Sequence, residues 1–148
     1  MVAATAVRTE RRWELPHAAS AVPGAREELV DLLESLGVPE STVVEAELTA
    51  SELLGNAVMH GRPGARGNIS LRVRVREQVV EVAVTDGGPA DGQVVDVRPR
   101  RTSVVATRGR GLRIVRSLAH EWGVVVDQEA GDTTVWATIG GPSWRRAT

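Results

Sequence analysis

A carboxylate and an amide stand one helical turn apart in this chain of 148 residues, at Glu52 and Asn56. The surrounding segment, from about Pro39 or Ser41 to His60, carries apolar residues at helical spacing, which predicts a helix with both side chains on one face. A carboxylate placed in this way can act as a general base, and an amide oxygen is a hard ligand suited to Mg²⁺. Taken alone, the pair is more typical of a solvated polar stripe, so other motifs must decide between the two interpretations.

Two further motifs lie at strand ends. Asp86 closes an apolar strand and is followed by Gly87 and Gly88. An acid there can meet the edge of a ligand, and glycine, which has no Cβ, lets a ligand approach the backbone. An ordinary Asp-Gly turn explains the same residues. Thr133 and Thr134 open the last strand, where a hydroxyl can bond a ligand or water, although threonine is also a normal strand residue.

The run Arg108-Gly109-Arg110-Gly111-Leu112 is a glycine-rich turn that leads into an amphipathic helix. Free backbone N–H groups at a helix start, together with the helix dipole, bind phosphate well. Arg108 and Arg110 add positive charge beside them. Glycines that serve only as a hinge are an equally good explanation of this run.

The elements that must position these motifs follow from periodicity and turn residues. We expect one α+β domain, a two-layer sandwich in which a mostly antiparallel mixed sheet is covered on one face by about three helices. Its domain would span residues 12–140, with a flexible N-terminus at 1–11, a lid at about 87–107 and a tail at 141–148. The expected order is a strand at 12–15, helices at about 20–36 (Ser20 as N-cap, Pro23 in the first turn) and 41–60, strands at 69–76 and 79–85, a helix at 112–120, and strands at 121–127 and 133–139.

Composition excludes several classes of protein. The net charge is −1, so nothing at whole-chain level attracts nucleic acid or an anionic membrane. The chain has no lysine, which excludes a P-loop NTPase, and no cysteine, which excludes disulfides and thiolate chemistry. No apolar run is long enough to span a membrane. We therefore expect a cytoplasmic protein.

Together, the order and spacing of the motifs resemble the N, G1, G2 and G3 boxes of the Bergerat (GHKL) ATPase superfamily. The resemblance covers about Arg12 to Ile139 and rests most on the Glu-x-x-x-Asn-Ala-x-x-His-Gly run that begins at Glu52 and on the Gly-x-Gly-Leu helix start at Gly109. Among the members, the chain looks most like the stand-alone anti-sigma-factor serine/threonine kinases and related ATP-binding regulatory proteins. The resemblance implies the Bergerat fold.

The resemblance also implies roles for individual residues. Asn56 would coordinate the Mg²⁺ that bridges the phosphates of ATP, and Glu52 would be the general base. Asp86 would accept the exocyclic amine of adenine, which favours ATP over GTP, and Gly88 would let the backbone lie close to the base. His60 would line the nucleotide site or simply end the helix.

The remaining implied contacts concern the phosphates and the support of the base. Thr133 or Thr134 would support Asp86 and adenine, and the sequence does not say which. The chain departs from the family where Pro89 and Ala90 replace a second spaced glycine after Asp86. The residues that would hold the phosphates are Arg108, Gly109, Arg110, Gly111 and Leu112.

Two functions follow from the resemblance. The first is an anti-sigma factor that phosphorylates its antagonist, so that a sigma factor and an anti-anti-sigma (STAS-type) protein would be its partners. The second is a non-catalytic module that binds a partner in one nucleotide state. A detached histidine-kinase catalytic domain is a weaker alternative, because it would need a phosphoacceptor-histidine helix that this sequence lacks. Related kinases often dimerise, but no interface stripe stands out, so a homodimer is left open.

Overall fold

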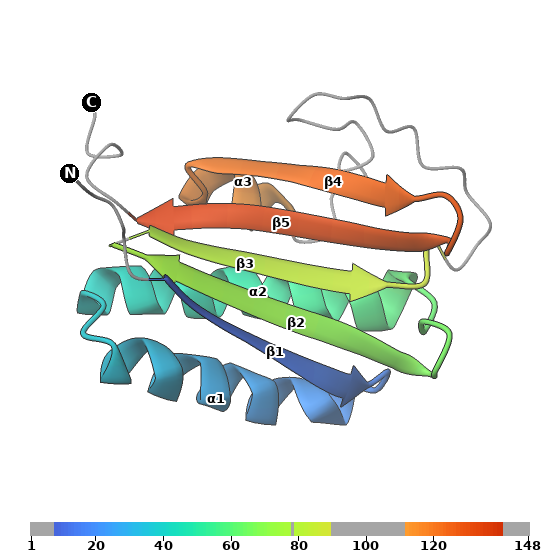
Figure 1. The fold of residues 1–148 in the computed structure, drawn as a ribbon, viewed down its shortest axis with the longest axis horizontal. Coiled ribbons are helices and arrows are strands. Elements are labelled where there is room, and N and C mark those ends of the chain that lie inside the picture. Colours follow the sequence, from blue (N-terminus) through green and yellow to red (C-terminus); the bar gives the residue numbers. More distant parts are fainter. Residues whose placement is uncertain (1–7, 78, 90–111, 141–148) are drawn as a thin grey trace.

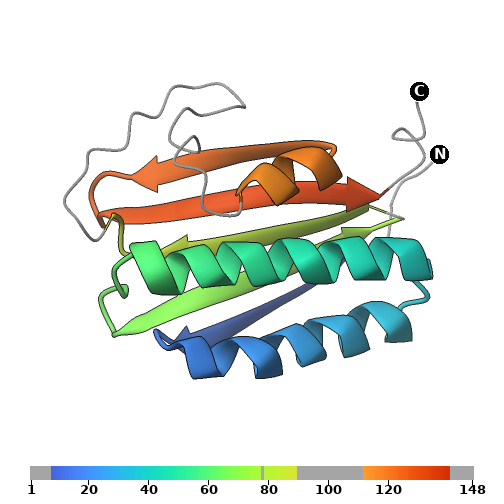
Figure 2. The same ribbon diagram turned by 180° about the vertical axis from the view of Figure 1, so that it is seen from behind.

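The computed structural model describes residues 8–77, 79–89 and 112–140, which form a sheet with helices on one of its faces (Figure 1). The view from behind shows α1, α2 and α3 lying over that face (Figure 2). The elements in chain order are β1 (Arg8–Pro16), the 3-10 helix η1 (Ala19–Ala21), α1 (Val22–Ser35), α2 (Glu40–His60), β2 (Asn68–Arg76), β3 (Val79–Asp86), α3 (Leu112–Leu118), β4 (Glu121–Asp127) and β5 (Asp132–Gly140).

The five strands lie in the order β1-β2-β3-β5-β4. The predicted two-layer α+β sandwich is confirmed. The sheet differs from the expected mixed sheet in one respect, since all four strand pairs within the described residues are antiparallel. The order brings β3 beside β5, so the two strand ends that carry Asp86 and Thr133 lie next to each other.

The core lies between the sheet and the two long helices. Alternate residues of β2, Ile69, Leu71, Val73 and Val75, are buried, as the alternation in the sequence predicts. α2 meets the sheet through small residues such as Ala50, which is fully buried and lets the helix axis come close. Each buried Val, Leu or Ile side chain contributes about 1.5–3 kcal/mol relative to exposure. This packing holds α2 rigidly over the sheet.

Several element boundaries differ from the sequence-based expectation, mostly by one residue, and three of the differences have a clear structural reason. β1 begins at Arg8 instead of Arg12, because its ladder with β2 continues to the Arg8–Arg76 pair. Ser20 is not the N-cap of α1: it lies within η1, and the N-cap is Ala21, without a side-chain cap. α3 ends at Leu118 instead of His120, because the His120 N–H donates to the Thr138 carbonyl, 2.7 Å away, and so begins the approach to β5.

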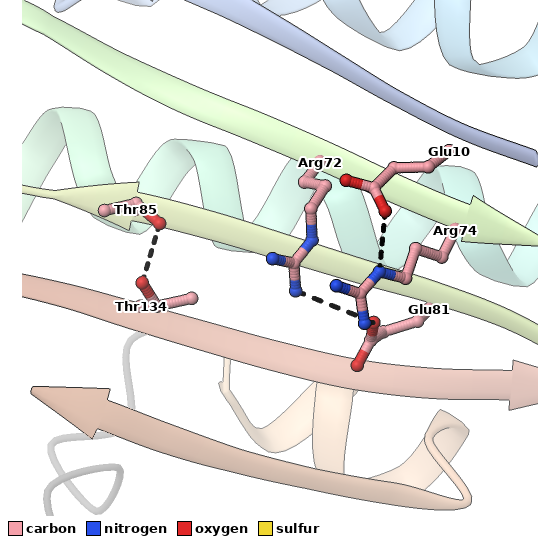
Figure 3. A network of polar contacts seen from close by, with 6 residues as sticks. All are labelled: Glu10, Arg72, Arg74, Glu81, Thr85 and Thr134. Atoms are coloured by element: carbon pink, nitrogen blue, oxygen red, sulfur yellow. Dashed lines mark hydrogen bonds and ion pairs between the residues drawn. The ribbon is translucent and has the colours of Figure 1, made fainter.

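The other face of the sheet carries a charged network (Figure 3). Arg74 forms ion pairs with Glu10 at 3.0 Å and with Glu81 at 3.3 Å, and Arg72 lies 3.6 Å from Glu81. The arginine row that β2 displays is therefore partly neutralised by acids of the neighbouring strands. Exposed pairs of this kind contribute about 1 kcal/mol at most. Among the helices of the described residues, none is long and apolar enough to cross a membrane.

Candidate functional site

Asp86 stands at the end of β3 on the face of the sheet that the helices cover. The alternate residues Val80, Val82 and Val84 are buried there, and Asp86 continues their row. The Gly88 N–H donates to Asp86 Oδ1 over 2.8 Å, which fixes the carboxylate. Burial raises the pKa of Asp86 to about 6, while this hydrogen bond and the nearby charges of His17 and Arg62 lower it. Asp132, also close by, adds to the rise in the pKa of Asp86.

The end of α2 is joined to the end of β3. Gly61 and Pro89 form an isolated antiparallel bridge. On either side of it, the Arg62 N–H donates to the Gly88 carbonyl at 2.8 Å and the Gly87 N–H donates to the Arg62 carbonyl at 2.6 Å. The helix that carries Glu52 and Asn56 is therefore held in a fixed relation to the strand that carries Asp86.

Gly61 permits this junction because it has no side chain. A Cβ at this position would overlap the carboxyl group of Asp86 and would lie 3.0 Å from the Ala57 carbonyl. The backbone of Gly61 has φ −102°, which any residue can adopt, so the constraint is space and not backbone strain. Gly61, the glycine that follows His60, therefore allows the Asp86 carboxylate to lie close to α2.

We expect Gly61→Ala to destabilise the fold by about 1–3 kcal/mol, the usual cost of overpacking, and to displace the Asp86 carboxylate. Urea unfolding at pH 7.5 measures the first effect. Gly55→Ala is the matched control, because Gly55 lies inside α2 with nothing within 4 Å of a Cβ. That substitution should stabilise the protein by about 0.5–1 kcal/mol through helix propensity. If both alanines had the same effect, the close contact would not constrain Gly61.

His17 is a second residue that supports this junction, and no motif pointed to it. Its Nε2 lies 3.0 Å from both the Ala57 carbonyl and the Gly61 carbonyl, so an Nε2–H serves two acceptors at the end of α2. The Ala57 carbonyl also accepts the Gly61 N–H at 3.1 Å, so His17 adds a second hydrogen bond at the C-terminus of the helix. The only signal in the sequence is a histidine directly after the strand-ending Pro16, which by itself does not indicate a helix cap 40 residues away.

Glu52 and Asn56 lie on α2 as predicted, and both side chains are half-buried. Within the described part of the chain neither forms a side-chain hydrogen bond or ion pair, so both remain available to a ligand. Glu45 and Thr49 continue the same polar line, but Thr49 is fully buried and burial raises the pKa of Glu45. His60 ends α2 and is exposed.

The register of β3 and β5 separates the two candidate threonines. Thr133 is the partner of Asp86, and Thr134 is the partner of Thr85. Paired residues of antiparallel strands share a face of the sheet, so Thr133 lies on the face of Asp86. Thr134 lies on the other face, where its hydroxyl is 2.7 Å from that of Thr85 (Figure 3). Of the two residues left open by the sequence, only Thr133 shares the face of Asp86, and the contact of either threonine with a nucleotide stays a prediction.

Comparison with known proteins decides the family. The model of the histidine kinase-like ATPase domain matches residues 15–139. The chain belongs to this family. The resemblance to the Bergerat superfamily is thereby confirmed.

Two solved structures similar to this histidine kinase-like ATPase domain share its fold. The first holds the RsbU and RsbW domains of Rv1364c from Mycobacterium tuberculosis, with 21% identity and a TM-score of 0.65, covering 90% of this chain and 33% of that one. The second is the SiaB–SiaC complex from Pseudomonas aeruginosa, with 11% identity and a TM-score of 0.63, covering 87% of this chain and 88% of that one. This chain thus spans about a third of the first. No curated protein sequence matches it.

The described part of this ATPase domain fits a nucleotide with Mg²⁺. Asp86 offers a half-buried acceptor, and Gly88, with φ +100°, puts no side chain beside it. No group of three or more His, Cys, Asp or Glu in the described residues could hold a metal ion. Asn56, together with the phosphates, stays the predicted ligand of a Mg²⁺ ion. Arg108, Gly109, Arg110 and Gly111 lie outside the described residues, as does most of the lid, and the side chain of Leu112 is not described. Their roles stay predictions.

Proposed function

We propose that this ATPase domain is an anti-sigma factor that binds ATP with Mg²⁺ and transfers a phosphoryl group to a serine or threonine of an anti-anti-sigma (STAS-type) protein. The observation that carries the nucleotide part is the fixed Asp86 carboxylate, held by the Gly88 N–H and packed against Gly61. The motif resemblance to anti-sigma-factor kinases supports the transfer. The likeness to a structure that holds an RsbW domain, and to SiaB in complex with SiaC, supports a protein partner.

Each described residue has a distinct task in this proposal. Asp86 accepts a hydrogen bond from the exocyclic amine of adenine, and Thr133 lies beside it on the same face. The Asn56 oxygen orients Mg²⁺, which when bound supplies neutralisation of charge on the phosphates. Glu52, one helical turn away, takes the proton from the attacking hydroxyl, and the oxygen of that hydroxyl forms the new bond to phosphorus while ADP leaves. The phosphorylated partner and ADP are the products.

A non-catalytic switch is the second candidate, and one observation favours it. Pro89 and Ala90 follow Gly88 where the family usually has a second spaced glycine, and the backbone of Pro89 is bridged to Gly61. Proline fixes φ near −65°, so the start of the lid is stiffer than a glycine hinge would be. A stiff start to the lid suits a protein that holds its nucleotide and presents one of two surfaces to a partner.

Calorimetric titration of the purified protein with Mg-ATP, Mg-ADP and Mg-GTP tests the proposal. We expect ATP and ADP to bind in the micromolar range and GTP at least about tenfold more weakly, because the guanine O6 would face the Asp86 carboxylate without a proton between them. A folded protein that bound none of the three would contradict the proposal and would leave a scaffold that uses this fold only to bind a partner.

A further inference from the structure

Arg62 lies at the junction between α2 and β3 and has no assigned role. Its backbone is fixed on both sides: its N–H donates to the Gly88 carbonyl and its carbonyl accepts from the Gly87 N–H. Its side chain is exposed, and within the described residues it forms no hydrogen bond or ion pair. An arginine on a rigid backbone with an unused guanidinium group is available to a ligand.

The guanidinium group lies beside the residues that would receive the base. One of its nitrogens is 3.9 Å from the point where a Cβ of Gly88 would stand, and that point is 3.0 Å from the Gly131 carbonyl. Gly88 has φ +100°, a conformation that side-chain-bearing residues rarely adopt. Gly88 is itself buried, with the Gly131 carbonyl on one side and the Arg62 guanidinium group near it, so no side chain of residue 88 stands between Arg62 and Asp86.

We propose that Arg62 is a base-binding residue that stacks its guanidinium plane on the purine base whose amine Asp86 binds. This inference rests on the proposed nucleotide-binding function. A guanidinium group is planar, weakly hydrated and well suited to lie on an aromatic ring, whereas the ammonium of lysine is a compact, strongly hydrated charge. The contact involves the base and not the phosphates.

Competition binding of adenosine, AMP and ADP against a fluorescent ADP analogue tests this role. We expect Arg62→Ala to lower the affinity for all three ligands by a similar factor of about ten. This is the magnitude typical of a partly desolvated cation–π contact. Arg62→Lys should lose most of the same factor, because it keeps the charge but not the plane. Arg66→Ala is the matched control: Arg66 is an exposed arginine of the same loop, and its removal should change each affinity by less than about twofold.

The possible outcomes separate this inference from the proposed function. If wild-type protein binds ADP but Arg62→Ala behaves like Arg66→Ala, the inference fails and the proposed function stands. A loss that is large for ADP and absent for adenosine would assign Arg62 to the phosphates, which also overturns the inference. Full affinity in Arg62→Lys would show that charge alone matters. If the folded wild-type protein bound no nucleotide, the proposed function itself would fail. Thermal unfolding of each variant confirms that it is folded.

Discussion

Replacing Asp86 with asparagine should weaken the binding of ADP by about 10- to 150-fold. The amide can still accept the Gly88 N–H through one oxygen, so the local backbone is kept, but the charged acceptor is lost and an amide donor takes the place of the second oxygen. A donor facing the adenine amine leaves two donors opposed. Removing a charge-assisted hydrogen bond at a half-buried site costs about 1.5–3 kcal/mol, which corresponds to the stated factor. Calorimetric titration with Mg-ADP at pH 7.5 measures it.

The selectivity between purines provides the sharper test of Asp86. The guanine O6 accepts hydrogen bonds, so the amide of the new asparagine can donate to it. Asp86→Asn should therefore reduce the preference for ATP over GTP while it also weakens the binding of ATP. Asp127→Asn is the matched control, since the Asp127 carboxylate ends β4, is exposed, and among the described residues accepts only from the backbone N–H groups of Glu129 and Ala130. Unchanged ADP binding in Asp86→Asn, or an equal loss in Asp127→Asn, would remove Asp86 from the nucleotide site.

Replacing Asp86 with asparagine should also make the nucleotide-free protein more stable at neutral pH. The pKa of Asp86 is about 6 in the folded protein, chiefly because of burial, against 3.8 for an ordinary aspartate. Between these two values the unfolded chain releases its proton while the folded chain retains it, so the free energy of unfolding falls as the pH rises through this window. Below the window the carboxyl is protonated in both states, and above it the penalty is constant. Asp86→Asn removes a penalty of the order of 1 kcal/mol at pH 7.5, and this gain should vanish near pH 4.

The sequence pattern alone predicts the motifs but not how they are arranged in space. Pro39 and Gly61 predict the two ends of α2 almost to the residue. The alternation of apolar and polar residues in β2 predicts the buried face of that strand. Those features are local, because they depend on the periods of the helix and the strand. The contact of Gly61 with Asp86 and the link from His17 to the end of α2 join segments far apart in the chain, and no local period encodes them.

Strand register sets the second limit on what the sequence predicts. Thr133 and Thr134 are equivalent as neighbours in a strand, and a shift of one residue would exchange their faces. Only the pairing of Asp86 with Thr133 assigns one to the helix-covered side. The N-cap of α1 could not be placed for a related reason. Ser20 has the right chemistry for a cap, but the approach from His17 forms a 3-10 turn first, and α1 begins after it.

Replacing Glu52 with glutamine should lower phosphoryl transfer to the partner protein by about 10²–10⁴-fold while the affinity for ADP changes by less than about threefold. The loss is the usual contribution of a general base, and the amide has nearly the same shape as the carboxylate but cannot accept the proton. Glu52 is half-buried and its side chain forms no hydrogen bond or ion pair in the described residues, so the fold should depend little on its charge. Single-turnover transfer of labelled phosphate to a STAS-type protein encoded nearby measures the rate.

Glu47→Gln is the control that separates catalysis from a general effect of charge on α2. Glu47 lies on the same helix but pairs with Arg26 of α1, with 3.4 Å between Oε2 and Nε, so it lies on the side of α2 that faces α1. Its substitution should leave the transfer rate within about twofold. If Glu52→Gln transferred phosphate at the wild-type rate, Glu52 would not be the base. The wild-type protein could also bind ATP and transfer no phosphate to any such partner, while the nucleotide still changes the binding of the partner. In that case the protein would be a non-catalytic switch controlled by whether the nucleotide site is occupied. The stiff Pro89 hinge and the unused Glu52 carboxylate would then belong to that switch.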